Sequence, residues 1–311
     1  MLNKDFAVVF PGQGSQHLGM LNEINLISNE VQLRFEEASD ALGYNLWDIT
    51  QNDSDKLNQT EFTQPALLTA SYVIWCIYSS KSDALPKIMA GHSLGEYTAL
   101  VAAGSLNFVD AVRLVAARGK FMQEAQPVGI GAMAAILGLD NDKIADVLAS
   151  INDSSQSVVE IANLNAHGQT VIAGSKHSVV LAMEQLKIKG AKIVKLLDVS
   201  VPSHCSLMLP AAERLKGLLD QTNFKTPNIP VIHNYSLASY TDPLDIKHAL
   251  FEQLIRPVRW VETIEFISAH HTKNIYEFGP GSVLSKLCKR IDDNVKAEAI
   301  NSIDAINNLS Q

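Results

Sequence analysis

The segment Gly91–Gly95, with the sequence GHSLG, stands between a short apolar run and an alanine- and leucine-rich stretch. The preceding run, Lys87–Ala90, is typical of a buried strand, and Glu96–Ala103 is typical of a helix. Glycine at both ends of a sharp turn removes side chains that would clash there. The pattern predicts a nucleophile elbow that exposes the Ser93 hydroxyl at a sheet edge. An ordinary glycine-rich turn is the alternative interpretation.

The composition excludes several classes of protein. The 311 residues are 47% hydrophobic and 19% charged, which is enough apolar material for one large core. The formal net charge of -8 argues against a nucleic-acid-binding protein, because phosphate contacts need a basic surface. Cys76, Cys205 and Cys288 are far apart and lack the spacing of a disulfide framework or a zinc site.

The N-terminus has no pattern typical of an export signal, and the composition fits a reducing cytoplasm. The uncharged stretch Phe62–Ser80 contains a proline and several polar side chains, so we expect a buried core helix there instead of a membrane span. The sequence therefore predicts a cytoplasmic protein that binds neither a membrane nor a metal ion.

Apolar strand-like runs alternate with amphipathic helical stretches, which is typical of an α/β protein with a largely parallel sheet. The strands expected in this sheet are Phe6–Phe10, Lys87–Gly91, Val231–Tyr235 and Asn274–Phe278. The helices expected around it are Glu30–Leu42, Pro65–Ser79, Leu94–Ala103, Asn107–Ala125, Leu207–Gln221, Asp245–Ile255, Trp260–His270 and Val283–Ile291.

The interval from Pro127 to Leu196 has a different order of elements: strand, helix, strand, strand, helix, strand. This βαββαβ order is typical of a ferredoxin-like unit. We therefore expect a hydrolase-like large α/β domain formed by residues 1–126 and 197–311, with a ferredoxin-like small domain, residues 127–196, inserted into it. A cleft is expected where the two domains meet.

A serine hydroxyl needs a base that accepts its proton before it can attack a carbonyl. Of the nine histidines, His204 follows a strand at the point where the chain returns to the large domain. This position places it near the expected cleft, so His204 is the candidate base. A helix-capping or core histidine is the alternative interpretation.

A second glycine-rich turn, Phe10–Gln16 with the sequence FPGQGSQ, follows the first expected strand. The third glycine of a dinucleotide loop would fall on His17, so phosphate binding is a poor interpretation. The turn, at Gln13, is instead a candidate source of backbone N–H groups for an oxyanion, with a simple turn as the alternative. Arg118, in an apolar helical stretch, is a candidate carboxylate ligand, although the residues alone favour a surface or structural arginine.

Five motifs, in this order along nearly the whole chain, resemble one family, the malonyl-CoA:acyl carrier protein transacylases of bacterial type II fatty-acid synthesis. These motifs are Phe10–Gln16, Gly91–Glu96, Arg118–Gln123, Val201–Cys205 and Glu277–Gly281. The resemblance implies the same inserted ferredoxin-like unit and a ping-pong acyl transfer. Malonyl would pass from coenzyme A to Ser93 and then to the phosphopantetheine thiol of acyl carrier protein, with His204 as the base.

The resemblance also implies roles for other residues. The backbone N–H groups of Gln13 and Leu94 would hold the oxyanion, and Arg118 would pair with the free malonyl carboxylate. The main-chain carbonyl of Gln253 would orient His204 in place of an aspartate. The implied partners are malonyl-CoA and acyl carrier protein, no cofactor or metal is implied, and we expect a monomer.

Three other functions stay open. A serine thioesterase or esterase would share the GxSxG motif, with Asp198 ahead of His204 as its acid. A stand-alone acyltransferase of a polyketide synthase would share every catalytic residue and differ only in its carrier. A non-catalytic carrier-binding protein is the third function, and the presence of Ser93, His204, Gln13 and Arg118 together argues against it.

Overall fold

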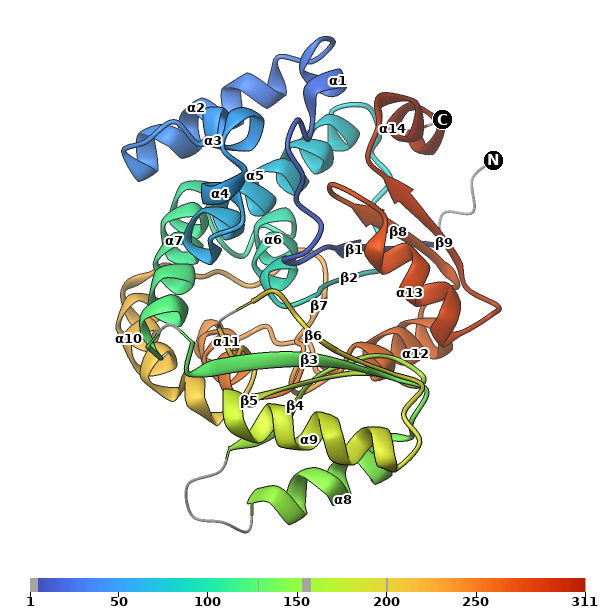
Figure 1. Ribbon diagram of the computed structural model, residues 1–311. Helices are drawn as coiled ribbons and strands as arrows, with labels where there is room; N and C mark the ends of the chain where they lie inside the picture. The colour runs from blue at the N-terminus through green and yellow to red at the C-terminus, as the bar shows by residue number, and fades with distance from the viewer. Residues whose placement is uncertain (1–4, 128, 153–157, 200, 311) are drawn as a thin grey trace.

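The computed structural model describes residues 5–127, 129–152, 158–199 and 201–310. Val128 and Ser200, at the expected crossings between domains, and the N-terminal residues 1–4 lie outside this part of the chain. Within it, two separate β-sheets and the helices packed on them build the molecule (Figure 1). The α/β class expected from the sequence is confirmed.

A parallel sheet, which we call the large sheet, contains five strands of the described chain in the order β7-β2-β1-β8-β9. Its strands are β1 (Ala7–Phe10), β2 (Ile88–Gly91), β7 (Val231–Ile232), β8 (Asn274–Phe278) and β9 (Lys296–Ile300). Because β1 and β2 are adjacent and parallel, the loops that follow them lie at the same edge of the sheet. The two glycine-rich turns of the sequence are therefore neighbours.

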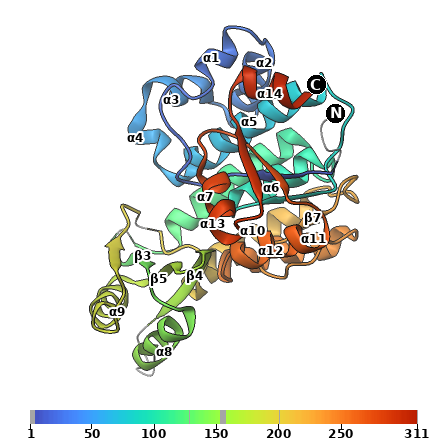
Figure 2. The same cartoon turned by 90° about the vertical axis from the view of Figure 1, so that its right-hand side faces the viewer.

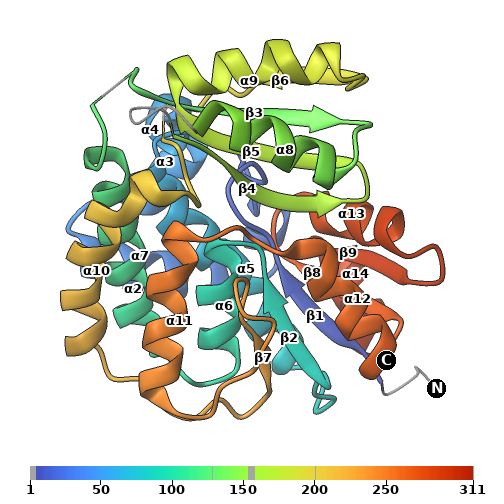
Figure 3. The ribbon, with the colours of Figure 1, turned by 90° about the horizontal axis from the view of Figure 1, so that it is seen from below.

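Both faces of the large sheet are covered. In β1, Val8 and Phe10 belong to one core cluster, whereas Ala7 and Val9 belong to another, as expected for a strand buried on both sides. The first cluster includes residues of α1 (Asn22–Asn25), α2 (Glu30–Leu42), α3 (Leu46–Asn52), α4 (Ser54–Leu57), α5 (Thr60–Ser79), α6 (Leu94–Ala102), α7 (Phe108–Glu124), α10 (Leu209–Gln221), α11 (Pro243–Ile255) and α14 (Ile303–Ser310). The second includes residues of α12 (Trp260–His270) and α13 (Val283–Ile291). Figure 3 shows α10 and α11 side by side along one flank of the molecule.

The second sheet, which we call the small sheet, is antiparallel and has the order β4-β5-β3-β6. Its strands and helices are β3 (Gly131–Leu137), α8 (Asn141–Asn152), β4 (Val159–Ala166), β5 (Gln169–Ser175), α9 (Lys176–Ile188) and β6 (Ile193–Leu196). Both helices lie on the face turned away from the large sheet (Figures 1 and 2). The βαββαβ order predicted for this interval is confirmed, and so is the ferredoxin-like arrangement.

The differences from the sequence prediction have physical causes. The strand predicted as Val231–Tyr235 ends at Ile232, because the His233 side chain and the Asn234 N–H bind a buried carboxylate instead of continuing the sheet. The segment between the small sheet and α10 ends with a short 3-10 turn, Ser206–Met208, so the helix predicted from Leu207 begins at Leu209. The sequence prediction missed α1, α3, α4, β9 and α14, each of which is eight residues long or shorter.

The uncharged stretch expected to form a core helix lies almost entirely within α5, whose residues are mostly buried. Among the helices of the described residues, none combines the length and apolar character needed to cross a bilayer.

Three glycines allow the backbone of the elbow to cross very close to β1. A Cβ atom added to Gly95 would overlap the carbonyl oxygen of Phe10, and one added to Gly91 would overlap the Gly95 backbone. A Cβ atom on Gly12 would overlap the carbonyl oxygen of His92. The start of α6 therefore packs directly on the end of β1, which fixes the direction in which Ser93 leaves the sheet.

We predict that Gly95→Ala lowers the free energy of unfolding by more than about 2 kcal/mol, because its methyl group has no space without moving the backbone. Gly217→Ala is the matched control, because Gly217 lies in the exposed interior of α10 with open space at its Cβ position. That change should be stabilising by about 0.5–1 kcal/mol. Urea unfolding of both variants measures the difference, and equal stabilities would contradict the close backbone contact.

Candidate active site

A cavity of about 400 Å³ lies where the elbow of the large sheet faces the small sheet. Ser93, Arg118 and His204 line it from the large-sheet side, and Met133 and Val171 line it from the small sheet. The predicted cleft between the two units is therefore present. It brings together residues that are more than a hundred positions apart in the sequence.

Ser93 occupies the turn between β2 and α6 in a backbone conformation that is unusual for a residue with a side chain, with φ 53° and ψ -105°. Such a conformation persists only where the surroundings hold it. The Ser93 N–H donates to Asn234 Oδ1 at 2.7 Å, and the Ser93 carbonyl accepts from Gln253 Nε2 at 3.0 Å. Both polar groups of the Ser93 backbone are thus held by side chains from outside the elbow.

His204 is buried and lies beside the serine hydroxyl. The Ser93 Oγ donates to His204 Nε2 at 2.8 Å, and His204 Nδ1 donates to the main-chain carbonyl of Gln253 at 2.7 Å. Since a carbonyl can only accept, the proton of the neutral ring lies on Nδ1 and leaves Nε2 free to accept. Burial lowers the pKa of His204 most, the positive charge of Arg118 lowers it further, and the pKa is about 3. At neutral pH the ring is therefore an uncharged base.

Arg118, on α7, is only 1% exposed, so of the surface or structural arginine favoured by the residues alone, the surface position is excluded. Its guanidinium donates to three oxygen atoms: Gln64 Oε1 at 2.8 Å, Gln253 Oε1 at 2.9 Å and Ser93 Oγ at 3.1 Å. Burial lowers its pKa. Within the part of the chain that the structure describes, no carboxylate forms an ion pair with it. A buried cation without a paired anion is well suited to receive the carboxylate of a ligand.

Gln13 and Leu94 border the same cavity. Leu94 is the first residue of α6, where backbone N–H groups have no partner within the helix and the positive end of the helix dipole lies. Neither the Leu94 nor the Gln13 N–H donates a hydrogen bond to another described residue. Both are therefore available for an oxygen atom that gains negative charge beside Ser93.

Gln253 makes one contact with its main chain and three with its side chain. Its carbonyl accepts from His204, its Oε1 accepts from Arg118, and its Nε2 donates to Ser93 and to Glu96. The main-chain contact is the one that the family resemblance implies. The side-chain contacts could not be found from the sequence, because they join α11 to residues of the elbow, α6 and α7 that lie 135 to 160 positions away.

The acid of the esterase alternative is not in place. Asp198 is exposed and makes no hydrogen bond or ion pair with His204, whose Nδ1 is occupied by the Gln253 carbonyl. Among the described residues, no group of three or more His, Cys, Asp or Glu side chains could hold a metal ion.

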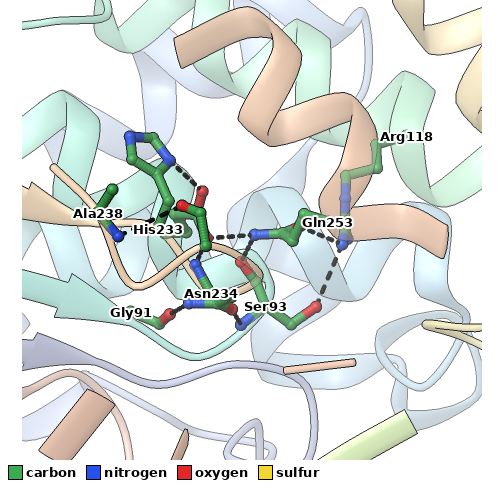
Figure 4. A network of polar contacts seen from close by, with 9 residues as sticks. Gly91, Ser93, Arg118, His233, Asn234, Ala238 and Gln253 are labelled. Carbon is green, nitrogen blue, oxygen red and sulfur yellow. Dashed lines mark hydrogen bonds and ion pairs between the residues drawn. The ribbon is translucent and has the colours of Figure 1, made fainter. Parts of the chain in front are cut away.

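Sequence reasoning missed a buried network behind the serine, which includes Glu96, His233 and Asn234 (Figure 4). Glu96 carries a signal that could have found it, since it is a single carboxylate within an otherwise apolar helical run. His233 and Asn234 carry a weaker one, because they follow directly on a buried strand.

The low pKa of His204 predicts an acid-sensitive fold. The folded pKa of about 3 lies below the unfolded value of about 6.5. Between these two pH values the unfolded chain binds a proton at His204 that the folded chain does not. Stability is therefore lost as the pH falls. Between about pH 7.5 and about pH 5, wild type should lose about 2 kcal/mol more than His204→Gln in urea unfolding. His177→Gln, at an exposed position on α9, should behave as wild type.

Comparisons with known proteins agree with this geometry. The family model described as "Acyl transferase domain" matches residues 7–303. The malonyl CoA-acyl carrier protein transacylase of Salmonella typhimurium is 50% identical over 302 residues, which cover 97% of each chain. The solved transacylase from Coxiella burnetii is 47% identical with a TM-score of 0.96, covering 98% of this chain and 96% of that one.

A malonyl-transacylase solved in complex with its type II polyketide acyl-carrier protein is also similar, with 47% identity and a TM-score of 0.94 over 97% of this chain and 98% of that one. Fold, site and sequence agree across the full length of these relatives. The chain therefore belongs to the acyl transferase family, as one of the malonyl CoA-acyl carrier protein transacylases.

Proposed function

We propose that this chain transfers malonyl from malonyl-CoA to the phosphopantetheine thiol of acyl carrier protein through an ester on Ser93, supplying malonyl carrier protein for fatty-acid elongation. The observation that carries the proposal is the position of Arg118, a buried cation without a paired carboxylate whose guanidinium lies 3.1 Å from Ser93 Oγ. When a malonyl thioester is bound for attack by Ser93, the guanidinium is therefore within reach of its free carboxylate.

In the first half-reaction, Ser93 Oγ attacks the thioester carbonyl carbon while its proton passes to His204 Nε2 along the 2.8 Å hydrogen bond. The tetrahedral intermediate collapses with cleavage of the carbon–sulfur bond. The proton on His204 Nε2 passes to the departing sulfur, and coenzyme A leaves as a free thiol. The malonyl group stays on Ser93 as an ester.

In the second half-reaction, the carrier thiol gives its proton to His204 and its sulfur attacks the ester carbonyl. The carbon–oxygen bond to Ser93 then breaks, and His204 returns its proton to Ser93 Oγ. The hydrogen bond from Nδ1 to the Gln253 carbonyl keeps the ring in one orientation through both halves. In each half the backbone N–H groups of Gln13 and Leu94 stabilise the oxyanion.

Arg118 selects the acyl group. Its planar guanidinium can bind both oxygens of the malonyl carboxylate, whereas an acetyl group would leave the buried donors unpaired. The bound carboxylate also neutralises a cation that has no paired anion among the described residues. This arrangement favours a dicarboxylate monothioester over uncharged acyl donors.

The relatives support this substrate and this partner, since their names specify malonyl CoA and acyl carrier protein, and one was solved with its carrier. Every proposed step uses groups of this chain and its two substrates, without a further cofactor. The expected monomer stays a prediction.

The proposal includes the division into a large domain of residues 1–126 and 197–311 and a small domain of residues 127–196. Support comes from the two sheets, which do not share a strand within the described residues. The first boundary falls beside Val128, which lies outside the described residues, and the second follows Leu196 at the end of β6. The cavity between the sheets would then receive the acyl end of each thioester.

We predict that Ser93→Ala abolishes the malonyl adduct, because the change removes the only atom that forms the ester in this mechanism. Intact-mass spectrometry after mixing with malonyl-CoA reads the adduct directly. Ser203→Ala is the matched control, since Ser203 borders the same cavity and should leave the adduct in place.

The same assay separates transferase from hydrolase. A transferase stops at one adduct per chain until carrier protein is added, whereas a thioesterase releases free malonate continuously. Wild-type protein that never gains the adduct would contradict the proposed function.

We predict that Arg118→Ala lowers kcat/KM for malonyl transfer about 100-fold more than for acetyl transfer, because charge-assisted hydrogen bonds to the carboxylate are lost. Arg113→Ala, at an exposed position on the same helix, should change neither. Steady-state rates with both donors measure the ratio. Equal losses with malonyl and acetyl would assign Arg118 to structure instead of specificity.

A further inference from the structure

Glu96 is a fully buried carboxylate in the first turn of α6, three residues after Ser93. It accepts three hydrogen bonds: from His233 Nδ1 at 2.7 Å, from the Asn234 N–H at 2.9 Å and from Gln253 Nε2 at 2.8 Å. No lysine or arginine of the described chain forms an ion pair with it. Burying a carboxylate costs free energy unless hydrogen bonds compensate for the lost water. The cost of burying Glu96 indicates a role in holding the site in addition to packing.

Two of these bonds lead directly to the serine. Asn234, whose N–H binds Glu96, uses its side chain to accept from the Ser93 N–H and to donate to the Gly91 carbonyl at 2.7 Å. Gln253, whose Nε2 binds Glu96, uses the same nitrogen to donate to the Ser93 carbonyl. The strained turn is therefore held on both sides by residues that share one carboxylate, as Figure 4 shows for the contacts among its labelled residues.

Glu96 also fixes the direction of the Gln253 side-chain amide. A carboxylate accepts only, so Glu96 fixes the NH₂ end of the amide toward itself and turns the oxygen toward Arg118, 2.9 Å away. The opposite orientation would place NH₂ against the guanidinium. Arg118 thus gains a neutral acceptor that leaves its charge available for a ligand.

We propose that Glu96 is a positioning residue for acyl transfer, which acts through Asn234 and Gln253 to hold Ser93 in its reactive conformation and Arg118 ready for a carboxylate. Glu96 touches neither substrate nor the reacting atoms. This inference rests on the proposed role of Ser93 as the nucleophile.

The test measures the reactivity of Ser93 toward phenylmethanesulfonyl fluoride, an uncharged reagent that needs no contact with Arg118. The Ser93 oxygen forms a bond to sulfur, its proton passes to His204, and fluoride leaves. For Glu96→Gln we expect the maximal rate of sulfonylation to fall about 100-fold, with the half-saturating concentration of reagent unchanged. A maximal rate within about threefold of wild type would overturn the proposal.

Glu277→Gln is the matched control. Glu277 is also fully buried and accepts from two backbone N–H groups, those of Leu284 and Ser285, at the start of α13. It contributes nothing to the lining of the cavity. Its sulfonylation rate per folded molecule should equal that of wild type, and a loss as large as that of Glu96→Gln would show general loosening and overturn the proposal.

A second pair of variants covers the case in which Glu96→Gln does not fold. His233→Asn places an amide near the position of Nδ1 and can still donate to Glu96, whereas His233→Leu has a similar shape and no donor. We expect Asn to retain the sulfonylation rate and Leu to lose it, and equal rates would overturn the proposal. Wild-type protein that is never labelled at Ser93 contradicts the proposed function itself, which distinguishes that failure from this one.

Discussion

The close backbone contact between β1 and the start of α6 is the constraint on which the site depends. Gly95 lies against the Phe10 carbonyl, so the helix after the elbow begins directly on the neighbouring strand. This contact brings the two glycine-rich loops together and places Gln13 and Leu94, whose N–H groups have no hydrogen-bond partner among the described residues, at one cavity. The proposed oxyanion site thus follows from how closely two pieces of backbone approach.

Burial determines the charges in the site and how they are paired. Among the described residues, a neutral histidine, an arginine without a paired carboxylate and a carboxylate without a lysine or arginine partner lie within one hydrogen-bonded network. The amide of Gln253 connects the two opposite charges without allowing them to meet. A direct ion pair between Arg118 and Glu96 would satisfy both charges and leave nothing for a substrate to complete.

The local parts of this structure could be predicted from the sequence, because the elbow and the βαββαβ order of elements follow from patterns of neighbouring residues. The place of His204 near the cleft follows from its position just after the last of those strands. The ends of long helices such as α2 and α12 agree with the periodicity. The network around Glu96 could not be predicted, since its bonds join residues 137 to 157 positions apart. The short length of β7 has the same origin, because a tertiary contact of His233 overrides the strand preference of its residues.

Reactivity in this chain belongs to the completed fold alone. Ser93, Arg118, His204 and Gln253 come from four segments spread over more than half of the sequence, and Ser93 and His204 both have backbone conformations that an isolated peptide avoids. During synthesis on the ribosome, a nascent chain that has not yet received α11 has no carbonyl to align its imidazole and no amide to brace its elbow. If Ser93 and His204 act as proposed, such an unfinished polypeptide lacks the groups that activate the serine, and we expect it not to take up acyl groups that it could not pass on.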